Sequence, residues 1–214
     1  MDAIQTIALG MGAAWASGIN LYATILVLGI LNLTGHVVLP PDLQVLSDPL
    51  VLAAAGLMYG VEFFADKVPG VDNGWDALHS FVRIPAGALL AAGAVAEVGP
   101  AAELAAALVG GSLAAATHAT KAGSRLLINT SPEPVTNWAA SIGEDVLAVA
   151  GLWTALNHPW IFLVLLAAFV LLLAWLLPRL WRAARRIGRG IAGLLRRRGA
   201  PARHGTGPAG EPGP

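Results

Sequence analysis

Two short polar segments of this sequence hold almost all of the side chains that could carry chemistry. The first runs from residue 62 to residue 83 and the second from residue 118 to residue 145. Carboxylates, basic groups and histidines set in apolar sequence bind ions or solutes, relay protons, or pair with one another. The candidate ligand-binding or transport residues are therefore Asn20, Glu62, Asp66, Lys67, Asp76, His79, Arg83, His118, Lys121, Arg125, Glu144 and Asp145.

The spacing of these groups predicts that they share helix faces. Glu62 and Asp66 are four residues apart, and Asp76 and His79 are three apart, so each pair lies on one side of a helix. A longer stripe on one helix follows the same rule and consists of His118, Lys121 and Arg125.

Backbone breaks accompany both segments. Pro69 and Gly70 interrupt the first, and Asp72 or Asn73 can cap the helix that follows. In the second, residues 130–132 offer a Thr or Ser cap and then a proline in the first helical turn. Each break has a tryptophan six residues after its proline, which is a faint internal repeat of Pro69–Trp75 and Pro132–Trp138. Interrupted helix pairs of this kind favour a transport site between repeats.

The charges of the two segments admit two interpretations. The structural one is a network of salt bridges, because five candidate carboxylates stand against four candidate basic side chains. The functional one is a solvated site, because a charge in the bilayer interior costs several kcal/mol and is retained where it pairs, faces a cavity or binds something. Both can hold at once, so the sequence leaves them open.

More specific chemistries have weaker patterns. Asp72, Asp76 and His79 form a candidate metal site of carboxylate and imidazole ligands, with no His-x-x-x-His or Glu-x-x-His motif beside it. The chain has no cysteine, which excludes thiolate ligands, disulfides and cysteine nucleophiles. Ser80 and Thr117 adjoin histidines only in sequence, so no catalytic residue is assigned and no cofactor is predicted.

The elements that must position these groups are apolar helices. The chain is 56% hydrophobic and 12% charged, about half the charge of a soluble domain. As one straight helix, the first apolar stretch, residues 3–33, would be ~46 Å long, which exceeds the bilayer core of ~30 Å. We therefore expect a break or kink at Ser17–Asn20, and a cleaved signal peptide ending near Ala16 is the alternative for its beginning. The prediction is an all-α, polytopic membrane helix bundle of about six broken or kinked spans: 3–33, 49–65, 75–98, 102–128, 135–156 and 159–178.

Lysine and arginine are distributed asymmetrically along these spans. With six spans, the connections near 66–75 and 122–134 lie on the side of both termini, and with the tail they contain or adjoin all 13 Lys and Arg. The loops of the other side contain none. The positive-inside rule then predicts that both termini are cytoplasmic in a multi-pass protein of the bacterial inner (plasma) membrane.

A basic tail follows a transmembrane domain of residues 1–178. Nine of the 13 Lys and Arg lie beyond residue 178, with apolar positions between them at helical spacing. Residues 179–198 are therefore predicted to form an amphipathic cytoplasmic helix that binds anionic lipids of the bilayer or extends the last span. Nucleic acid is not an expected partner, because the apolar face of this helix would have no role in binding a nucleic acid. The Gly/Pro-rich residues 199–214 are predicted to be disordered, and the oligomeric state is left open.

Several motifs resemble a known family. They are Gly18-Ile-Asn20-Leu-Tyr22, Ala65-Asp66-Lys67-Val-Pro69-Gly, Trp75-Asp76-Ala-Leu-His79, His118-Ala-Thr-Lys121-Ala and Asn129-Thr-Ser-Pro132-Glu133-Pro134. Over roughly residues 5–157 the sequence resembles the bacterial membrane-protein family called domain of unknown function 4126. The resemblance implies an integral membrane location. The motifs fall on the polar positions named above, which favours a site there.

Three functions remain as hypotheses. The first is passage of a small ion or solute through a polar site between broken helices. The acidic excess of the chain before residue 179 favours a cation, coupled to protons through His79 or His118. The second is a membrane-embedded enzyme acting on a lipid head group at the cytoplasmic face. The third is an assembly subunit without a site of its own.

Overall fold

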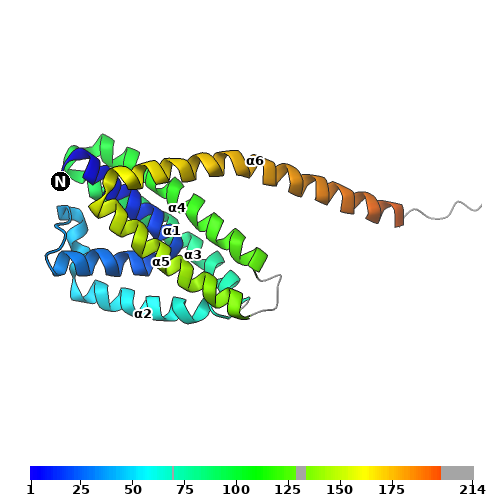
Figure 1. Cartoon of the computed structure of the whole chain (residues 1–214), viewed down its shortest axis with the longest axis horizontal. Coiled ribbons are helices and arrows are strands. Elements are labelled where there is room, and N and C mark those ends of the chain that lie inside the picture. The colour runs from blue at the N-terminus through cyan, green and yellow to red at the C-terminus, as the bar shows by residue number, and fades with distance from the viewer. Residues whose placement is uncertain (69, 129–133, 199–214) are drawn as a thin grey trace, which may run out of the picture. The chain divides into compact units, whose positions relative to one another are not determined.

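The computed structural model describes residues 1–68, 70–128 and 134–198, and all of its regular structure is helical (Figure 1). The chain divides into two compact units, one of residues 1–165 and one that begins at residue 166. The elements are α1 (Ala3–Leu33), the 3₁₀ helix η1 (Pro41–Ser47), α2 (Pro49–Ala65), α3 (Val71–Val95), the 3₁₀ helix η2 (Ala96–Val98), α4 (Pro100–Ile128), α5 (Pro134–Asn157) and α6 (Pro159–Arg198).

The helices agree closely with the six predicted spans. By length and composition alone, five of the described helices qualify as membrane spans, and α1 is counted among them over its whole length. The count becomes six if η1 and α2, which meet at a bend of 63°, form one span. The predicted all-α fold of several apolar helices is therefore confirmed.

The predicted break in the first apolar stretch is also confirmed, and it lies at Asn20. This residue has φ −146° and ψ 102°, which is extended backbone inside an otherwise helical segment. Its side-chain Oδ1 accepts a hydrogen bond of 2.9 Å from the Ala23 N–H, and its carbonyl accepts one from the Thr24 hydroxyl. An extended residue whose side chain bonds the N–H three positions on is a helix N-cap. Asn20 therefore begins a second helix inside α1.

The first half of α1, residues 3–19, runs antiparallel to α3. Gly10 lies against Ala94 near the end of α3, and Ser17 lies against Gly87, two turns nearer the start of α3. This half therefore enters the bundle at the end where α3 finishes and descends toward the end where α3 begins.

The second half of α1, residues 21–33, runs back the other way. Leu26 lies against Gly56 of α2, and Gly29 lies against Leu52, one turn nearer the start of α2. The start of α2 and the finish of α3 lie at the same end of the bundle, because α2 and α3 are joined at the opposite end by a short connection. Both halves thus open toward one end and meet at Asn20, as a helical hairpin (Figure 1).

This hairpin changes the predicted topology. Met1 and Glu97 line the same cavity, so the N-terminus lies at the end of the α3–α4 connection. The sequence analysis counted the first stretch as a full crossing and placed the N-terminus with the connections near 66–75 and 122–134. That grouping is wrong, because α1 turns back at Asn20 instead of crossing straight through.

Glycine and alanine let α1, α3 and α4 approach closely. A Cβ placed on Gly18 of α1 would lie 2.5 Å from the Ala114 carbonyl oxygen of α4. One placed on Gly87 of α3 would lie 2.9 Å from the Ser17 hydroxyl, and one on Gly110 of α4 would lie 2.9 Å from the Gly87 carbonyl oxygen. Contacts this short require the absence of a side chain, so these glycines serve helix packing.

The start of α3 differs in detail from the prediction. Asp72 and Asn73 were expected to cap this helix, but its N-cap is Gly70, whose φ of +88° suits glycine. Asp72 lies inside the first turn, where its Oδ1 accepts hydrogen bonds from the Gly70 and Asn73 N–H groups at 2.8 and 2.7 Å. The expected caps at 130–131 and the repeat prolines 69 and 132 lie outside the described residues.

In the second unit, α6 continues as one helix to Arg198, so the predicted boundary at residue 178 falls inside a helix. The predicted disordered residues 199–214 lie outside the described part of the chain.

Candidate functional site

The predicted polar residues of α2, α3, α4 and α5 meet in one buried cluster. We use "charge cluster" for the seven side chains joined by ion pairs, namely Glu62, Asp66, Asp76, Arg83, Lys121, Arg125 and Glu144. Six of them are at most 5% exposed, and the Glu144 side chain is 15% exposed. The end of the bundle that holds them is called the charged end below, and the end with the α3–α4 connection is called the pocket end.

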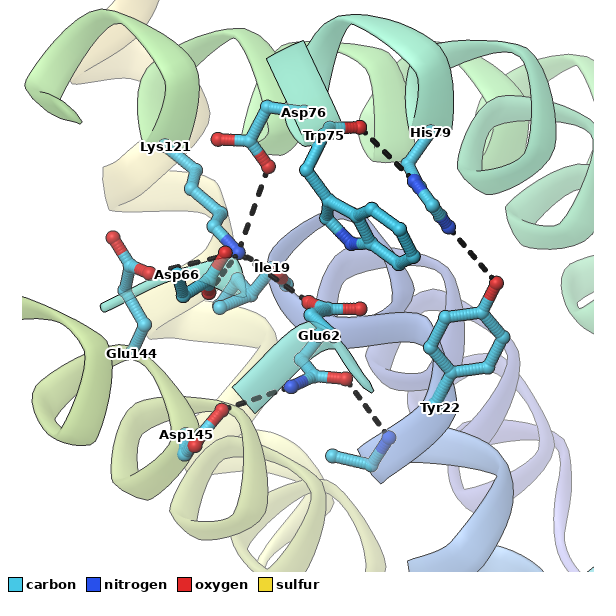
Figure 2. A network of polar contacts seen from close by, with 12 residues as sticks. Ile19, Tyr22, Glu62, Asp66, Trp75, Asp76, His79, Lys121, Glu144 and Asp145 are labelled. Atoms are coloured by element: carbon cyan, nitrogen blue, oxygen red, sulfur yellow. Dashed lines mark hydrogen bonds and ion pairs between the residues drawn. The ribbon is translucent and has the colours of Figure 1, made fainter. Parts of the chain in front are cut away.

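Lys121 lies at the centre of the charge cluster. Its Nζ is 3.0 Å from Asp66 Oδ2, and three further carboxylate oxygens lie slightly farther away (Figure 2). These are Glu62 Oε1 at 3.4 Å, Glu144 Oε2 at 3.6 Å and Asp76 Oδ1 at 3.7 Å. We call these four carboxylates the Lys121 cage. An ammonium has three N–H donors, so the cage offers more acceptors than Lys121 can use at once.

The break in α1 adds a fifth oxygen to the cage. In a regular helix the Ile19 carbonyl would accept the Ala23 N–H. Here Asn20 Oδ1 takes that N–H, and the Ile19 carbonyl accepts a hydrogen bond of 3.2 Å from Lys121 Nζ instead. The helix break at Asn20 thus frees a main-chain acceptor for Lys121.

Arg83 holds the α3 side of the charge cluster together with His118. Its Nη2 lies 2.5 Å from Glu62 Oε1, and its Nη1 lies 3.3 Å from Asp76 Oδ1 and 3.2 Å from His118 Nδ1. Arginine only donates hydrogen bonds, so His118 Nδ1 must accept and carries no proton. The other ring nitrogen, Nε2, then donates to the Asp76 carbonyl at 3.0 Å. His118 is therefore a neutral imidazole in this arrangement.

Arg125 ties three helices to one another. Its Nε and Nη2 bind both carboxylate oxygens of Glu144 at 3.0 and 2.7 Å, which is the strong bidentate arrangement. Its Nη1 donates to the Asp66 carbonyl at 3.1 Å and to Asn137 Oδ1 at 2.7 Å. The end of α2, the last turns of α4 and the start of α5 therefore depend on one guanidinium group.

Beside the charge cluster, His79 links α3 to the second half of α1. Its Nδ1 lies 2.9 Å from the Trp75 carbonyl, which can only accept, so this nitrogen carries a proton. Its Nε2 lies 3.0 Å from the Tyr22 hydroxyl, which can donate or accept. Tyr22 can thus pair with neutral His79 or with its imidazolium by rotating one hydroxyl hydrogen.

Asp145 forms a separate junction. Its Oδ1 accepts a hydrogen bond from Asn20 Nδ2 at 2.9 Å, and its Oδ2 accepts one from the Tyr59 hydroxyl at 3.1 Å. The residue at the break in α1 is therefore fixed to α5, and α5 to α2.

The charge balance of this region is negative. The charge cluster has four carboxylates and three basic groups. Asp145 adds a fifth carboxylate and Lys67, which interacts with Asp145 and Asp66, adds a fourth basic group, so one negative charge remains when all are ionised. Among the described residues, buried carboxylate oxygens without a hydrogen-bond partner include Glu62 Oε2, Asp66 Oδ1 and Asp76 Oδ2. Buried polar atoms in this state call for a water molecule, a proton or an ion.

Lys67 lies beside the charge cluster without taking part in its ion pairs. Its Nζ donates to the Phe63 carbonyl at 3.0 Å and lies 2.8 Å from the centre of the Phe63 ring. Burial lowers the pKa of the Lys67 ammonium, and the carboxylates of Asp145 and Asp66 oppose that shift. Lys67 therefore anchors the α2–α3 connection.

The metal hypothesis gains no support from the geometry. Both nitrogens of His79 already have partners, and Asp72 accepts two backbone N–H groups. In the part of the chain that the structure describes, no three His, Asp or Glu side chains are placed to hold a metal. The assignment of Asp72, Asp76 and His79 as metal ligands therefore rests on their spacing alone.

Sequence reasoning omitted some members of this region from its candidates. Tyr22 and Tyr59 contact His79 and Asp145, and Asn137 binds Arg125. Their spacing was informative, because Tyr59 lies three residues before Glu62 and Asn137 lies seven before Glu144, on the same helix faces. A search for uncharged polar side chains on the charged stripes would have found both.

The pocket end has a different character. A cavity of about 900 Å³ opens there, lined mostly by apolar residues of α1, α3, α4 and the segment before α2. It reaches Gly10 on α1, Ala94 on α3 and Val109 on α4. Nothing in the sequence analysis predicted it.

Comparison with known proteins identifies the family of the chain. The model of the family described as "Domain of unknown function (DUF4126)" matches residues 7–179, most of the sequence. The chain belongs to this family. The match confirms the resemblance and extends it through the last span, while most of the basic segment stays outside. No curated protein and no solved structure matches the chain. For this DUF4126 protein, function must therefore be argued from the site itself.

Proposed function

We propose that this protein passes a small cation across the membrane, in exchange for protons, through the region where α1 breaks. The single observation that carries the proposal is the position of that break. Asn20 and Ile19 lie beside a buried cluster that has more carboxylates than basic groups and several unpartnered carboxylate oxygens. Broken helices that meet charged residues within the bilayer are the usual construction of a transporter site.

The cavity at the pocket end supplies the second half of a path. On each of α1, α3 and α4, a layer of small residues separates the cavity from the polar region. We call this the small-residue layer, and it consists of Ala14, Gly87, Ala91, Gly110 and Ala114. On α4 the cavity ends at Val109 and His118 lies nine residues on, ~13 Å along a helix. A barrier this thin and free of large side chains supports a closed state between the cavity and the charge cluster.

His79 supports the coupling to protons. It can gain a proton while keeping both of its partners, because Tyr22 then accepts where it had donated. His118 faces Arg83 and would lose that contact on protonation. Of the two histidines considered from sequence, His79 is therefore the better proton carrier.

The enzyme hypothesis receives less support. Ser80 Oγ lies 2.7 Å from His118 Nε2, which resembles a nucleophile beside its base. A general base must accept the hydroxyl proton at that nitrogen, but Arg83 forces Nδ1 to accept and leaves Nε2 protonated. The pair therefore lacks the tautomer that acyl or phosphoryl transfer would need.

We further propose that the charged end faces the cytoplasm of a plasma membrane, with the N-terminus on the outer face. Lys67, Lys121 and Arg125 lie toward the charged end, so the positive-inside rule supports this orientation. The basic segment after residue 178 would then contact anionic lipids of the inner leaflet.

Single cysteines test this topology in the cysteine-free chain. Asp2→Cys and Gln44→Cys should react with a membrane-impermeant thiol reagent from the outer face, and Val68→Cys only after the membrane is opened. If Asp2→Cys and Val68→Cys react from the same face, α1 crosses the membrane and the proposed orientation fails.

Flux in reconstituted vesicles tests transport. With a pH gradient across vesicles that contain the protein, adding Na⁺ or K⁺ should dissipate the gradient, and N-methyl-D-glucamine should not. Asp66→Asn should abolish the response, whereas Asp42→Asn, an exposed acid at the pocket end, should leave it unchanged. A gradient that no small cation dissipates would refute transport and leave the assembly-subunit hypothesis.

A further inference from the structure

We propose that the cavity at the pocket end binds a hydrophobic organic cation, meaning an apolar molecule that carries one ammonium or phosphonium charge. The inference goes beyond the proposed function, because it assigns a ligand to a part of the bundle that the small-residue layer separates from the charge cluster. It begins from the shape of the cavity, its apolar walls and the charges at its edge.

Two helix faces form the main walls of the cavity. The first half of α1 and the helix α4 touch at Gly18 and Ala114, and again at Ala14 and Gly110. Nearer the pocket end the same faces continue at helical spacing and line the cavity, with Ala3, Ile7 and Met11 on α1 and Ala102, Ala106 and Val109 on α4. Alanine at two of these α4 positions leaves a space between the helices. The wall from residue 3 to residue 11 is ~12 Å deep along the helix axis.

The size and lining of this space suit an apolar molecule. Its volume of about 900 Å³ is that of a small-molecule site, and such sites are mostly apolar with few polar groups. Val98 and Val109 line it and are 72% and 55% exposed, so no other part of the chain covers them. Among the polar side chains of the lining, Thr6 and Gln44 already donate to main-chain carbonyls. A hydrated metal ion would therefore find few ligands here, whereas a hydrocarbon body would fill the space.

The charges around the cavity select a cation. Glu97 lines it, and Asp2 and Glu103 are direct neighbours of lining residues in the sequence. All three acids are exposed. Residues 1–44 and 94–109 supply the whole lining and contain no Lys or Arg. A concave apolar surface edged by charges of one sign attracts ligands of the opposite sign, and it repels the anionic head groups of bilayer lipids. An apolar ligand with a positive charge is complementary to both features.

Equilibrium dialysis of the purified protein in a non-ionic detergent tests the proposal, with protein-free micelles as the background. The probe is tetraphenylphosphonium, and tetraphenylborate is the comparison, because each ion has four phenyl rings and the two differ in the sign of their charge. Saturable binding of tetraphenylphosphonium is expected, and it should weaken as salt screens the acids. Absence of saturable binding would overturn the proposal. No flux is measured, so the outcome is independent of transport.

Glu97 is the acid to change, because it lines the cavity and is exposed. Glu97→Gln should weaken binding of tetraphenylphosphonium about two- to fivefold, as expected for the loss of one exposed ion pair. Glu97→Lys should weaken it further and strengthen binding of tetraphenylborate. Asp48→Asn is the control, because it removes an exposed acid outside the cavity and asparagine can still cap α2. Equal losses in Glu97→Gln and Asp48→Asn would mean that general surface charge attracts the cation, and the site would be refuted.

Filling the cavity is the second test. Ala106→Phe places a ring in the space beside α1, so it should abolish saturable binding of tetraphenylphosphonium. Leu104→Phe is the control, because it places the same ring on the same helix at a position that is 63% exposed and does not line the cavity. If a folded Ala106→Phe protein binds the probe as well as Leu104→Phe does, the cation binds elsewhere and the proposal fails. Should Ala106→Phe not fold, the comparison of Glu97→Gln and Glu97→Lys decides.

Discussion

The two ends of the helix bundle are held together by different forces. At the charged end, long buried side chains such as Arg83 and Arg125 bridge helices through ion pairs and hydrogen bonds. Toward the pocket end, α1, α3 and α4 touch through glycine and alanine, with almost no side chain between them. Packing of small residues fixes how closely helices approach, whereas charged groups fix which faces meet. The small-residue layer is therefore held by close apolar packing, and the charged end is held by electrostatic contacts.

The largest expected effect is at the charged end. Arg125→Met removes the bidentate partner of Glu144, which keeps only its 3.6 Å ion pair with Lys121, and the donor that binds the Asp66 carbonyl. Removing one member of a buried ion pair costs about 3–5 kcal/mol, so this variant should unfold at much lower temperature or denaturant concentration in detergent. The double variant Arg125→Met, Glu144→Leu should recover part of the loss. A stability equal to that of Ser124→Ala would show that ion pairs do not assemble this end.

An intermediate effect is expected in the small-residue layer. Gly110→Val places a side chain against Ala91 and the Gly87 carbonyl, and overpacking of this kind costs about 1–3 kcal/mol. Gly60→Ala in α2 is the control, because a Cβ there meets nothing within 4 Å and alanine suits a helix interior better by about 0.5–1 kcal/mol. Unfolding in detergent should move in opposite directions for the two variants. If both variants were stabilised or both destabilised, close packing would not be what holds the small-residue layer together.

The smallest effect is expected where the two regions join. Asn20→Ala removes the cap of the second half of α1, a change that costs about 0.5–2 kcal/mol. Asn20→Ser keeps an oxygen for the Ala23 N–H but loses the amide that binds Asp145, so it should lie between alanine and wild type. If serine is no better than alanine in a denaturant titration, the Asp145 contact and not the cap sustains the break.

The sequence predicted the helices and their polar faces well because both depend on local periodicity. Apolar runs bounded by Pro, Gly and charge marked α2 to α5 to within a few residues, and the spacing of His118, Lys121 and Arg125 predicted a buried stripe. Asn20 was recognised as a break because polar and small residues interrupt an overlong apolar run.

The direction of the chain after that break was beyond such reasoning. A hydropathy pattern does not show in which direction the chain continues after a break, so a straight 31-residue helix and a hairpin give the same pattern. What selects the hairpin is contact with residues far along the sequence, such as the bond from Asn20 to Asp145. The placement of the N-terminus with the basic connections failed for this reason. The Lys121 cage was unforeseen in the same way, since spacing shows which groups share a face and not which faces meet.

The hairpin of α1 also has a consequence for biosynthesis. The Asn20 side chain bonds to a residue made 125 positions later, and the Ile19 carbonyl bonds to one made 102 positions later. Helix α1 therefore cannot reach its final shape until α4 and α5 have entered the membrane. Until then, its polar turn must be sheltered from lipid by the insertion machinery or by water at the bilayer surface. Helix α1 is thus made before α4 and α5 but reaches its final shape only after them.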